Sequence, residues 1–122
     1  MQKALRIRKV FGGGMRQAGF LAAAGIYAID HQWERLKEDH RKAKELGGAL
    51  SKLSQVDFVE EVETNIVIFQ LRPNEDIAGF MQLLQENKIL ISNMGQGKLR
   101  MVTHLDYTDA MHQQVMEVLG NI

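Results

Sequence analysis

The spacing of hydrophobic residues changes part-way along the chain. Between residues 33 and 50, apolar or small residues recur at steps of three and four, as they do on one face of a helix. Residues 2–10 carry a shorter helical pattern. A second helix is expected to begin near Met15 and to continue to about Gly47, or through a further short piece to Leu53. The first part of the chain is therefore predicted to be helical.

After Leu53 the pattern becomes typical of strands. Val56 to Val62 and Asn65 to Leu71 are predicted strands, and both alternating sets of the second are apolar, which indicates a central strand covered on both faces. The elements expected next are a helix from Ile77, a short strand over Ile89 to Ile91, a turn at Gly95-Gln96-Gly97, a strand over Lys98 to Leu105 and a final helix capped by Asp106 or Thr108. In the final helix, the residues expected to face inward are Met111, Val115, Val118 and Leu119, with Gly120 at its end.

This order of elements indicates an α+β fold. A long N-terminal helical part is followed by the succession ββαββα, with a small and mostly antiparallel sheet. We expect residues 1–122 to form a single domain, in which residues 1–53 are a helical interface segment and residues 54–122 are a small α/β sandwich.

Composition narrows the functional classes. The chain has 15 Lys and Arg against 15 Asp and Glu, so overall charge does not direct it to nucleic acid or to a membrane surface. It has no cysteine, which excludes disulfides and thiolate nucleophiles and fits a cytoplasmic location. No targeting signal or membrane-spanning run is visible. Positive charge is concentrated at one end, because residues 1–29 contain no acid and hold the bases Lys3, Arg6, Arg8, Lys9 and Arg16.

The segment GGGMR, residues 12–16, lies between two of the predicted helices. Glycines ahead of a helix let the backbone approach an anion, and the first free N–H groups of the helix favour a phosphate or carboxylate there. Lys9 and Arg16 would supply the charge. The segment matches no standard phosphate-binding motif, and a flexible hinge beside a solvated basic face is the alternative.

The next segment, AGFLAAAGIYA, is built mainly of small residues. Such a helix buries little apolar area by itself, so we expect part of its surface to belong to an interface. An ordinary alanine-rich helix, favourable by propensity alone, is the alternative.

Arg100 is the other candidate binding residue. It interrupts an apolar strand, and a guanidinium emerging from a sheet is suited to gripping a carboxylate through two hydrogen bonds. A salt bridge at the edge of the sheet is the more ordinary role. The four histidines show no metal-binding spacing and are expected to be surface or capping residues, so we predict no metal site. No serine lies in a nucleophile motif.

Three stretches carry a resemblance to a known family: RKVFGGGMRQAG (residues 8–19), the LAAAGIYA that follows, and LRMVTHLD (residues 99–106). Together they closely resemble the C-terminal portion of low-specificity L-threonine aldolases, pyridoxal phosphate (PLP) enzymes of the aspartate-aminotransferase-like fold, fold type I. The resemblance implies a carbon–carbon lyase that cleaves L-threonine or L-allo-threonine into glycine and acetaldehyde. It also implies the fold of the small C-terminal domain of such enzymes.

The resemblance implies roles for three residues. Lys9 and Arg16 match positions that serve the cofactor phosphate across a subunit interface, and Arg100 matches the arginine that holds the substrate's α-carboxylate. In the family, the lysine that forms the Schiff base lies upstream, in a serine-lysine-glycine motif that is absent here. We therefore expect no catalytic residue in this chain, no covalently bound PLP and no activity from the chain alone. Its partners would be a large PLP-binding domain, a second subunit as in a homo-oligomer, and the amino-acid substrate.

Two other functional classes remain open. The basic N-terminal helix could grip nucleic acid, but Phe11 is the only aromatic residue interleaved with its bases and the rest of the chain is acidic, so we expect no nucleic-acid binding. The chain could instead be a non-catalytic module that dimerises through its small-residue helix.

Overall fold

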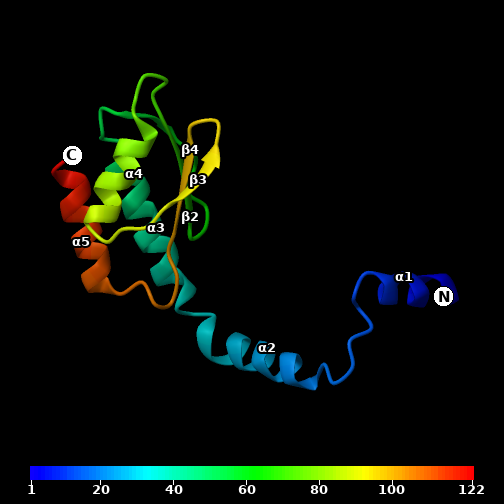
Figure 1. The fold of residues 1–122 in the computed structure, drawn as a ribbon. Coiled ribbons are helices and arrows are strands. Elements are labelled where there is room, and N and C mark those ends of the chain that lie inside the picture. The colour runs from blue at the N-terminus through cyan, green and yellow to red at the C-terminus, as the bar shows by residue number, and fades with distance from the viewer. The chain divides into compact units, whose positions relative to one another are not determined.

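The computed structural model describes all of residues 1–122 and contains five helices and four strands. The helices are α1 (Gln2–Val10), α2 (Gly19–Gln32), α3 (Leu36–Leu50), α4 (Ile77–Glu86) and α5 (Asp109–Gly120), and the strands are β1 (Val56–Val59), β2 (Ile66–Leu71), β3 (Ser92–Gly95) and β4 (Lys98–Val102). Figure 1 shows these elements along the chain. The strands form one antiparallel sheet in the order β1-β2-β4-β3. The predicted α+β class and the succession ββαββα are therefore confirmed.

The chain divides into two compact units, Met1–Glu34 and Arg35–Ile122. The first unit contains α1 and α2, and neither helix has a buried residue. The second unit contains the sheet and the other three helices. The predicted continuous helix from Met15 is wrong, because residues 33–35 form a turn between α2 and α3. The turn contains neither glycine nor proline, so the sequence has no helix-breaking residue there, and the helical pattern of apolar residues continues across the turn.

The core of the second unit lies between one face of the sheet and the helices α3, α4 and α5, which all lie on that face (Figure 1). Its buried apolar residues are Ala43, Leu46, Leu50, Val56, Val67, Phe69, Leu71, Phe80, Leu84, Leu99, Met101, Val115 and Leu119. Strand β2 is central, as predicted, and its alternate residues Val67, Phe69 and Leu71 point into the core. No helix of this unit covers the other face, where Ile66 is 40% exposed. The expectation that β2 is covered on both faces is therefore wrong for this unit.

The predicted strand over Ile89 to Ile91 is also displaced. Ile89 and Ile91 are half-buried and pack against the core, while pairing with β4 begins only at Ser92. An apolar run can pack in this way without joining a ladder, which explains the error. The turn that follows is as predicted, since Gly95, Gln96 and Gly97 have φ values of 83°, 53° and 81°.

Helix α5 begins with the predicted cap. Thr108 Oγ1 accepts a hydrogen bond of 3.2 Å from the backbone N–H of Met111. Val115 and Leu119 are buried as expected, but Met111 is 51% exposed, and His112 is buried instead. The register of the buried stripe therefore differs by one residue at its first turn. No helix of the chain is both long and apolar enough to cross a membrane.

Candidate functional site

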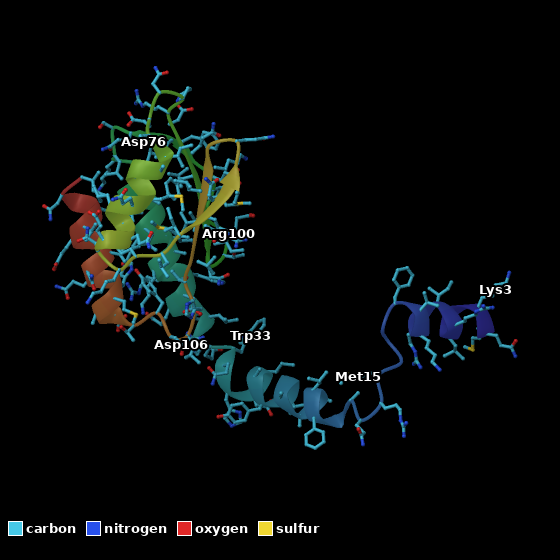
Figure 2. All side chains as sticks on the ribbon, viewed as in Figure 1. Lys3, Met15, Trp33, Asp76, Arg100 and Asp106 are labelled. Atoms are coloured by element: carbon cyan, nitrogen blue, oxygen red, sulfur yellow. The ribbon has the colours of Figure 1, made fainter.

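The three predicted binding residues fall in different units. Lys9 lies in the last turn of α1 and Arg16 lies three residues before α2, and both side chains are exposed. Arg100 lies in β4, in the second unit, and is half-buried. Figure 2 labels Arg100 on its strand. The structure thus brings Lys9 and Arg16 into one unit and describes Arg100 separately.

The three glycines close α1 rather than opening α2. The backbone N–H of Gly12 donates to the carbonyl of Lys9 at 3.1 Å, and that of Gly13 donates to the carbonyl of Arg8 at 2.8 Å. Gly12 has a φ of 81°, the left-handed conformation common after a helix end. The predicted anion site at the first turn of a helix is therefore wrong for the glycines themselves, because four residues separate them from Gly19, where α2 begins.

Gly13 and Gly14 lie close to the two basic side chains that precede them. A Cβ added at Gly13 would meet Arg8 Cγ at 2.6 Å, and one added at Gly14 would meet Lys9 Cγ at 3.1 Å. The stems of Arg8 and Lys9 therefore lie close against the backbone of this turn, and most closely at Gly13. Arg8 and Lys9 also face the negative end of the α1 dipole, which favours positive charge there.

Arg100 lies on the face of the sheet that the helices leave open. In β4, Leu99 and Met101 point into the core, so Lys98, Arg100 and Val102 lie on the opposite face. Lys98 donates to Glu60 at 2.7 Å and lies 5.9 Å from the ring centroid of Phe58. Arg100 has no such partner, and its Nε atom is buried without a hydrogen bond.

The lack of a partner distinguishes Arg100 from the other lysines and arginines that are at least partly buried. Of all lysines and arginines, four are buried or half-buried: Arg35, Lys42, Lys98 and Arg100. Three of them have a carboxylate oxygen within 2.9 Å, contributed by Asp39, Asp109 and Glu60 respectively. Arg100 alone has none. An unsatisfied buried N–H costs about 1–3 kcal/mol, so the Arg100 guanidinium is left with an unmet hydrogen-bonding requirement within this unit.

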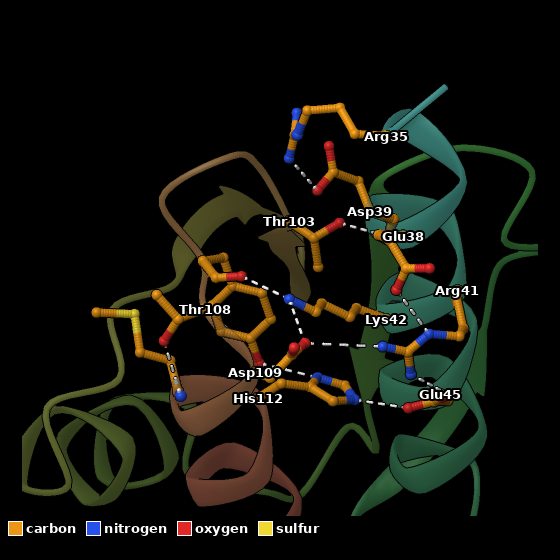
Figure 3. A network of polar contacts seen from close by, with 12 residues as sticks. Arg35, Glu38, Asp39, Arg41, Lys42, Glu45, Thr103, Thr108, Asp109 and His112 are labelled. Carbon is orange, nitrogen blue, oxygen red and sulfur yellow. Dashed lines mark hydrogen bonds and ion pairs between the residues drawn. The ribbon is translucent and has the colours of Figure 1, made fainter. Parts of the chain in front are cut away.

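Sequence reasoning missed a polar network between α3 and α5 (Figure 3). Buried Lys42 donates to the carbonyl of Tyr107 at 2.8 Å and pairs with Asp109 at 2.8 Å, which holds the pKa of the Asp109 carboxyl below its usual value. His112 Nε2 lies 2.7 Å from Glu45, and its Nδ1 lies 3.2 Å from the Tyr107 hydroxyl. Burial raises the pKa of Tyr107 to about 12.

This network corrects the expectation that all four histidines are surface or capping residues, since His112 is buried and the N-cap of α5 is Thr108. The pKa of the Glu45 carboxyl is lowered, first by its hydrogen bond from Arg41 and second by its hydrogen bond with His112. The spacing of His112, Val115 and Leu119, at i, i+3 and i+7, was the available signal. All members bind one another, so the network stabilises the packing of the two helices and leaves no group directed at a ligand. No three His, Asp or Glu side chains are arranged to hold a metal ion.

Comparison with known proteins assigns the chain to a family. Residues 1–73, more than half of the chain, match the family described as Beta-eliminating lyase. The chain belongs to this family. The matched part of this beta-eliminating lyase family member contains Lys9 and Arg16, and ends after strand β2.

Several proteins named as threonine aldolases are similar to this family member over nearly its whole length. It is 36% identical to a low specificity L-threonine aldolase of Escherichia coli K12, over 99% of this chain and 34% of that protein. It is 32% identical to low-specificity L-threonine aldolase 1 of Arabidopsis thaliana, over 95% of this chain and 35% of that protein. A probable low-specificity L-threonine aldolase of Schizosaccharomyces pombe is 32% identical, over 98% of this chain and 28% of that protein. The chain thus spans about a third of the length of the curated relatives it matches.

Proposed function

We propose that this chain is the small C-terminal portion of a PLP-dependent threonine aldolase. In this assignment, Arg100 binds the α-carboxylate of L-threonine or L-allo-threonine, and Lys9 and Arg16 bind the phosphate of the cofactor. The large PLP-binding domain and a second subunit supply the other half of the site, including the lysine that binds the cofactor covalently. The products are glycine and acetaldehyde.

The observation that carries this proposal is the unpartnered state of Arg100. Every other lysine or arginine that is buried or half-buried has a carboxylate partner within the chain, whereas Arg100 lies on an uncovered sheet face with its Nε unsatisfied. A guanidinium donates two parallel hydrogen bonds to a carboxylate. Such a pair fixes the orientation of an amino-acid substrate as well as binding it.

The residues of the first unit fit the cofactor's phosphate. Lys9 and Arg16 are exposed and have no acidic neighbour, since residues 1–29 contain no Asp or Glu. The Lys9 stem lies close to the backbone at Gly14, and this contact would reduce the freedom that the side chain loses on binding an anion. PLP, when bound, supplies the electron sink that cleavage of the bond between Cα and Cβ requires.

The surface of α2 supports the proposed partners. The helix GFLAAAGIYAIDHQ carries apolar residues around its whole circumference, yet none is buried within the chain. Helices of this kind are usually buried on all sides. We therefore assign α2 to contacts with the large domain and with a second subunit. A non-catalytic dimerisation module would use the same surface, but it would leave Arg100 without an explanation.

The test is a chimera with the Escherichia coli relative, in which the matching third of that enzyme is replaced by this chain. We expect the purified chimera to bind PLP and to release acetaldehyde from L-allo-threonine. Arg100→Ala should lower its kcat/KM by about 10- to 100-fold, since a hydrogen bond to a charged group contributes about 1.5–3 kcal/mol. Arg72→Ala, which removes an exposed arginine, is the matched control and should change little.

Two results would contradict the proposal. One is a folded, PLP-binding chimera that cleaves no β-hydroxy amino acid, or whose activity is the same with Arg100→Ala as without it. The other is acetaldehyde release by the 122-residue chain alone with PLP, which would show that the covalent lysine need not come from another part of the enzyme.

A further inference from the structure

The residue opposite Arg100 on the neighbouring strand is Ser92. Strands β3 and β4 pair antiparallel, and Ser92 is the registered partner of Arg100. Side chains directly opposite one another in such a pair lie on the same face of the sheet, with Cβ atoms about 4.5–5.5 Å apart. The Ser92 hydroxyl therefore shares the open face with the Arg100 guanidinium.

Ser92 lacks the partners that the other serines have. Ser51 Oγ donates to the carbonyl of Gly47 at 2.8 Å, and Ser54 Oγ donates to the side chain of Gln55 at 3.5 Å. The Ser92 hydroxyl makes no hydrogen bond within the chain, and all of β3 is exposed. Two neighbouring hydrogen-bond donors, the Ser92 hydroxyl and the Arg100 guanidinium, are thus unused on one surface.

The side chains around Ser92 and Arg100 offer few hydrogen-bond acceptors within the sheet. On β2 the registered partner of Arg100 is the apolar Ile68, and its same-face neighbours on β4 are the apolar Val102 and the cation Lys98, none of which accepts a hydrogen bond through its side chain. Glu60 binds Lys98 at 2.7 Å. Apart from solvent, an acceptor shared by both donors can be supplied by a ligand, and a carboxylate has enough oxygen lone pairs to accept from three N–H or O–H groups at once.

We propose that Ser92 is a second carboxylate-binding residue, whose hydroxyl donates to the same carboxylate that the Arg100 guanidinium holds. The inference rests on the proposed role of Arg100 and adds a donor that fixes the tilt of the carboxylate about the guanidinium. Ser92 contacts the substrate and does not merely support Arg100. Its removal therefore weakens binding of any small carboxylate, without changing the fold of an exposed edge strand.

The test uses the full 122-residue chain and sodium acetate as the probe, with the Nε–Hε resonance of Arg100 followed by NMR and sodium chloride at equal ionic strength as the blank. Acetate should shift this resonance in a saturable way. Ser92→Ala should weaken acetate binding by about fivefold, as expected for one solvent-exposed hydrogen bond of ordinary strength. Ser92→Thr keeps the hydroxyl and should bind as the parent does. Ser54→Ala, which removes a serine hydroxyl bound elsewhere, is the matched control.

The outcomes separate this inference from the proposed function. Equal acetate affinity in the parent chain and in Ser92→Ala would overturn the role of Ser92 and leave that of Arg100 standing. No saturable response of Arg100 in the parent chain would overturn both. In the active chimera, Ser92→Ala should raise KM for L-allo-threonine about fivefold with kcat unchanged within twofold. A fall in kcat at constant KM would show that Ser92 acts only on the structure of the site.

Discussion

At the scale of single residues, the second unit contains two kinds of buried polar group, those with hydrogen-bond partners and one without. Lys42 and His112 are buried and are bound on several sides by neighbouring groups, so they add to the packing of α3 against α5. Arg100 is half-buried, and its Nε has no partner. Burial without a partner is costly, and it persists where a ligand or a missing surface completes the site. This difference is why we treat Lys42 and His112 as parts of a structural cluster and propose Arg100 as a binding residue.

Tyr107 gives a pH-dependent prediction at this scale. Burial raises its pKa to about 12 from a reference value of 10.0, because the charged phenolate is disfavoured in the folded chain. The stability that it contributes is therefore fully present below pH 10 and is lost as the pH rises through about 12. Denaturant unfolding at increasing pH should show the free energy of unfolding falling across this range.

The spectroscopic control uses the two tyrosines of the chain. Phenolate absorbance should include a late phase that Tyr107→Phe removes and Tyr27→Phe retains. If the late phase survives in Tyr107→Phe, the assignment to this buried phenol is wrong.

At the scale of elements, two adjacent glycines of α3 have opposite roles. Gly47 is buried, and a Cβ added there would meet Val62 Cγ2 at 2.8 Å, whereas one added at Gly48 would meet nothing within 4 Å. We expect Gly48→Ala to raise the free energy of unfolding by about 0.4–1 kcal/mol through helix propensity and loss of unfolded-chain entropy. Gly47→Ala should lower it by about 1 kcal/mol, because overpacking against the loop outweighs that gain.

Each of the two variants serves as the control for the other, since the helix, the substitution and the change in propensity are the same. Urea unfolding followed by circular dichroism measures both. A stabilising Gly47→Ala would mean that the segment around Val62 moves away at little cost, and that α3 packs less tightly on the sheet than the structure indicates.

The elements also show which parts of the fold the hydrophobic pattern predicts and which it does not. Steps of three and four located α3, α4 and α5, and alternation located β4, because one buried face imposes these spacings, whereas β2 was located by its continuous apolar run. The spacing of apolar residues did not reveal the break at residues 33–35 or the start of β3 at Ser92. The apolar residues around positions 33–35 fit either one continuous helix or two helices, and those at positions 89–91 fit either a strand or a packed segment before one. Tertiary packing decides between these arrangements.

The candidate site was predictable only in part. Residue type alone marked Arg100, because a cation within an apolar strand is unusual. The missing carboxylate partner and the pairing with Ser92 depend on sheet register, which joins residues from separate strands and which no local pattern contains. The glycine run between two helices was equally compatible with ending one or beginning the next, and only the backbone hydrogen bonds show that it ends α1.

At the scale of the whole molecule, the two units differ in how they treat apolar side chains. All buried apolar residues belong to Arg35–Ile122, while the first unit exposes large ones such as Phe20 and Ile29, at 86% and 68%. Surfaces of this kind usually mark an interface. If α2 makes the contacts proposed above, the large domain and the second subunit would cover these side chains.

We therefore predict that the chain alone self-associates through its first unit. Static light scattering over a range of concentrations should show masses above 13.8 kDa. Phe20→Gln combined with Ile29→Gln should reduce the association. The control pair Leu90→Gln with Leu105→Gln, which are 82% and 60% exposed in the second unit, should not reduce it. A monomer at every concentration would contradict the interface assigned to α2.

The predicted division of the chain at residue 53 leads to a last experiment, on two fragments. Fragment 35–122 keeps the complete core and should unfold cooperatively at the same denaturant midpoint as the full chain. Fragment 54–122 lacks α3 and with it Leu46 and Leu50, whose burial is worth about 3–6 kcal/mol together. A small domain has a total stability of only about 5–15 kcal/mol, so this fragment should show no cooperative transition and poor amide dispersion by NMR. If fragment 54–122 unfolds as sharply as fragment 35–122, then α3 belongs with the interface helices, and the boundary lies at residue 53 after all.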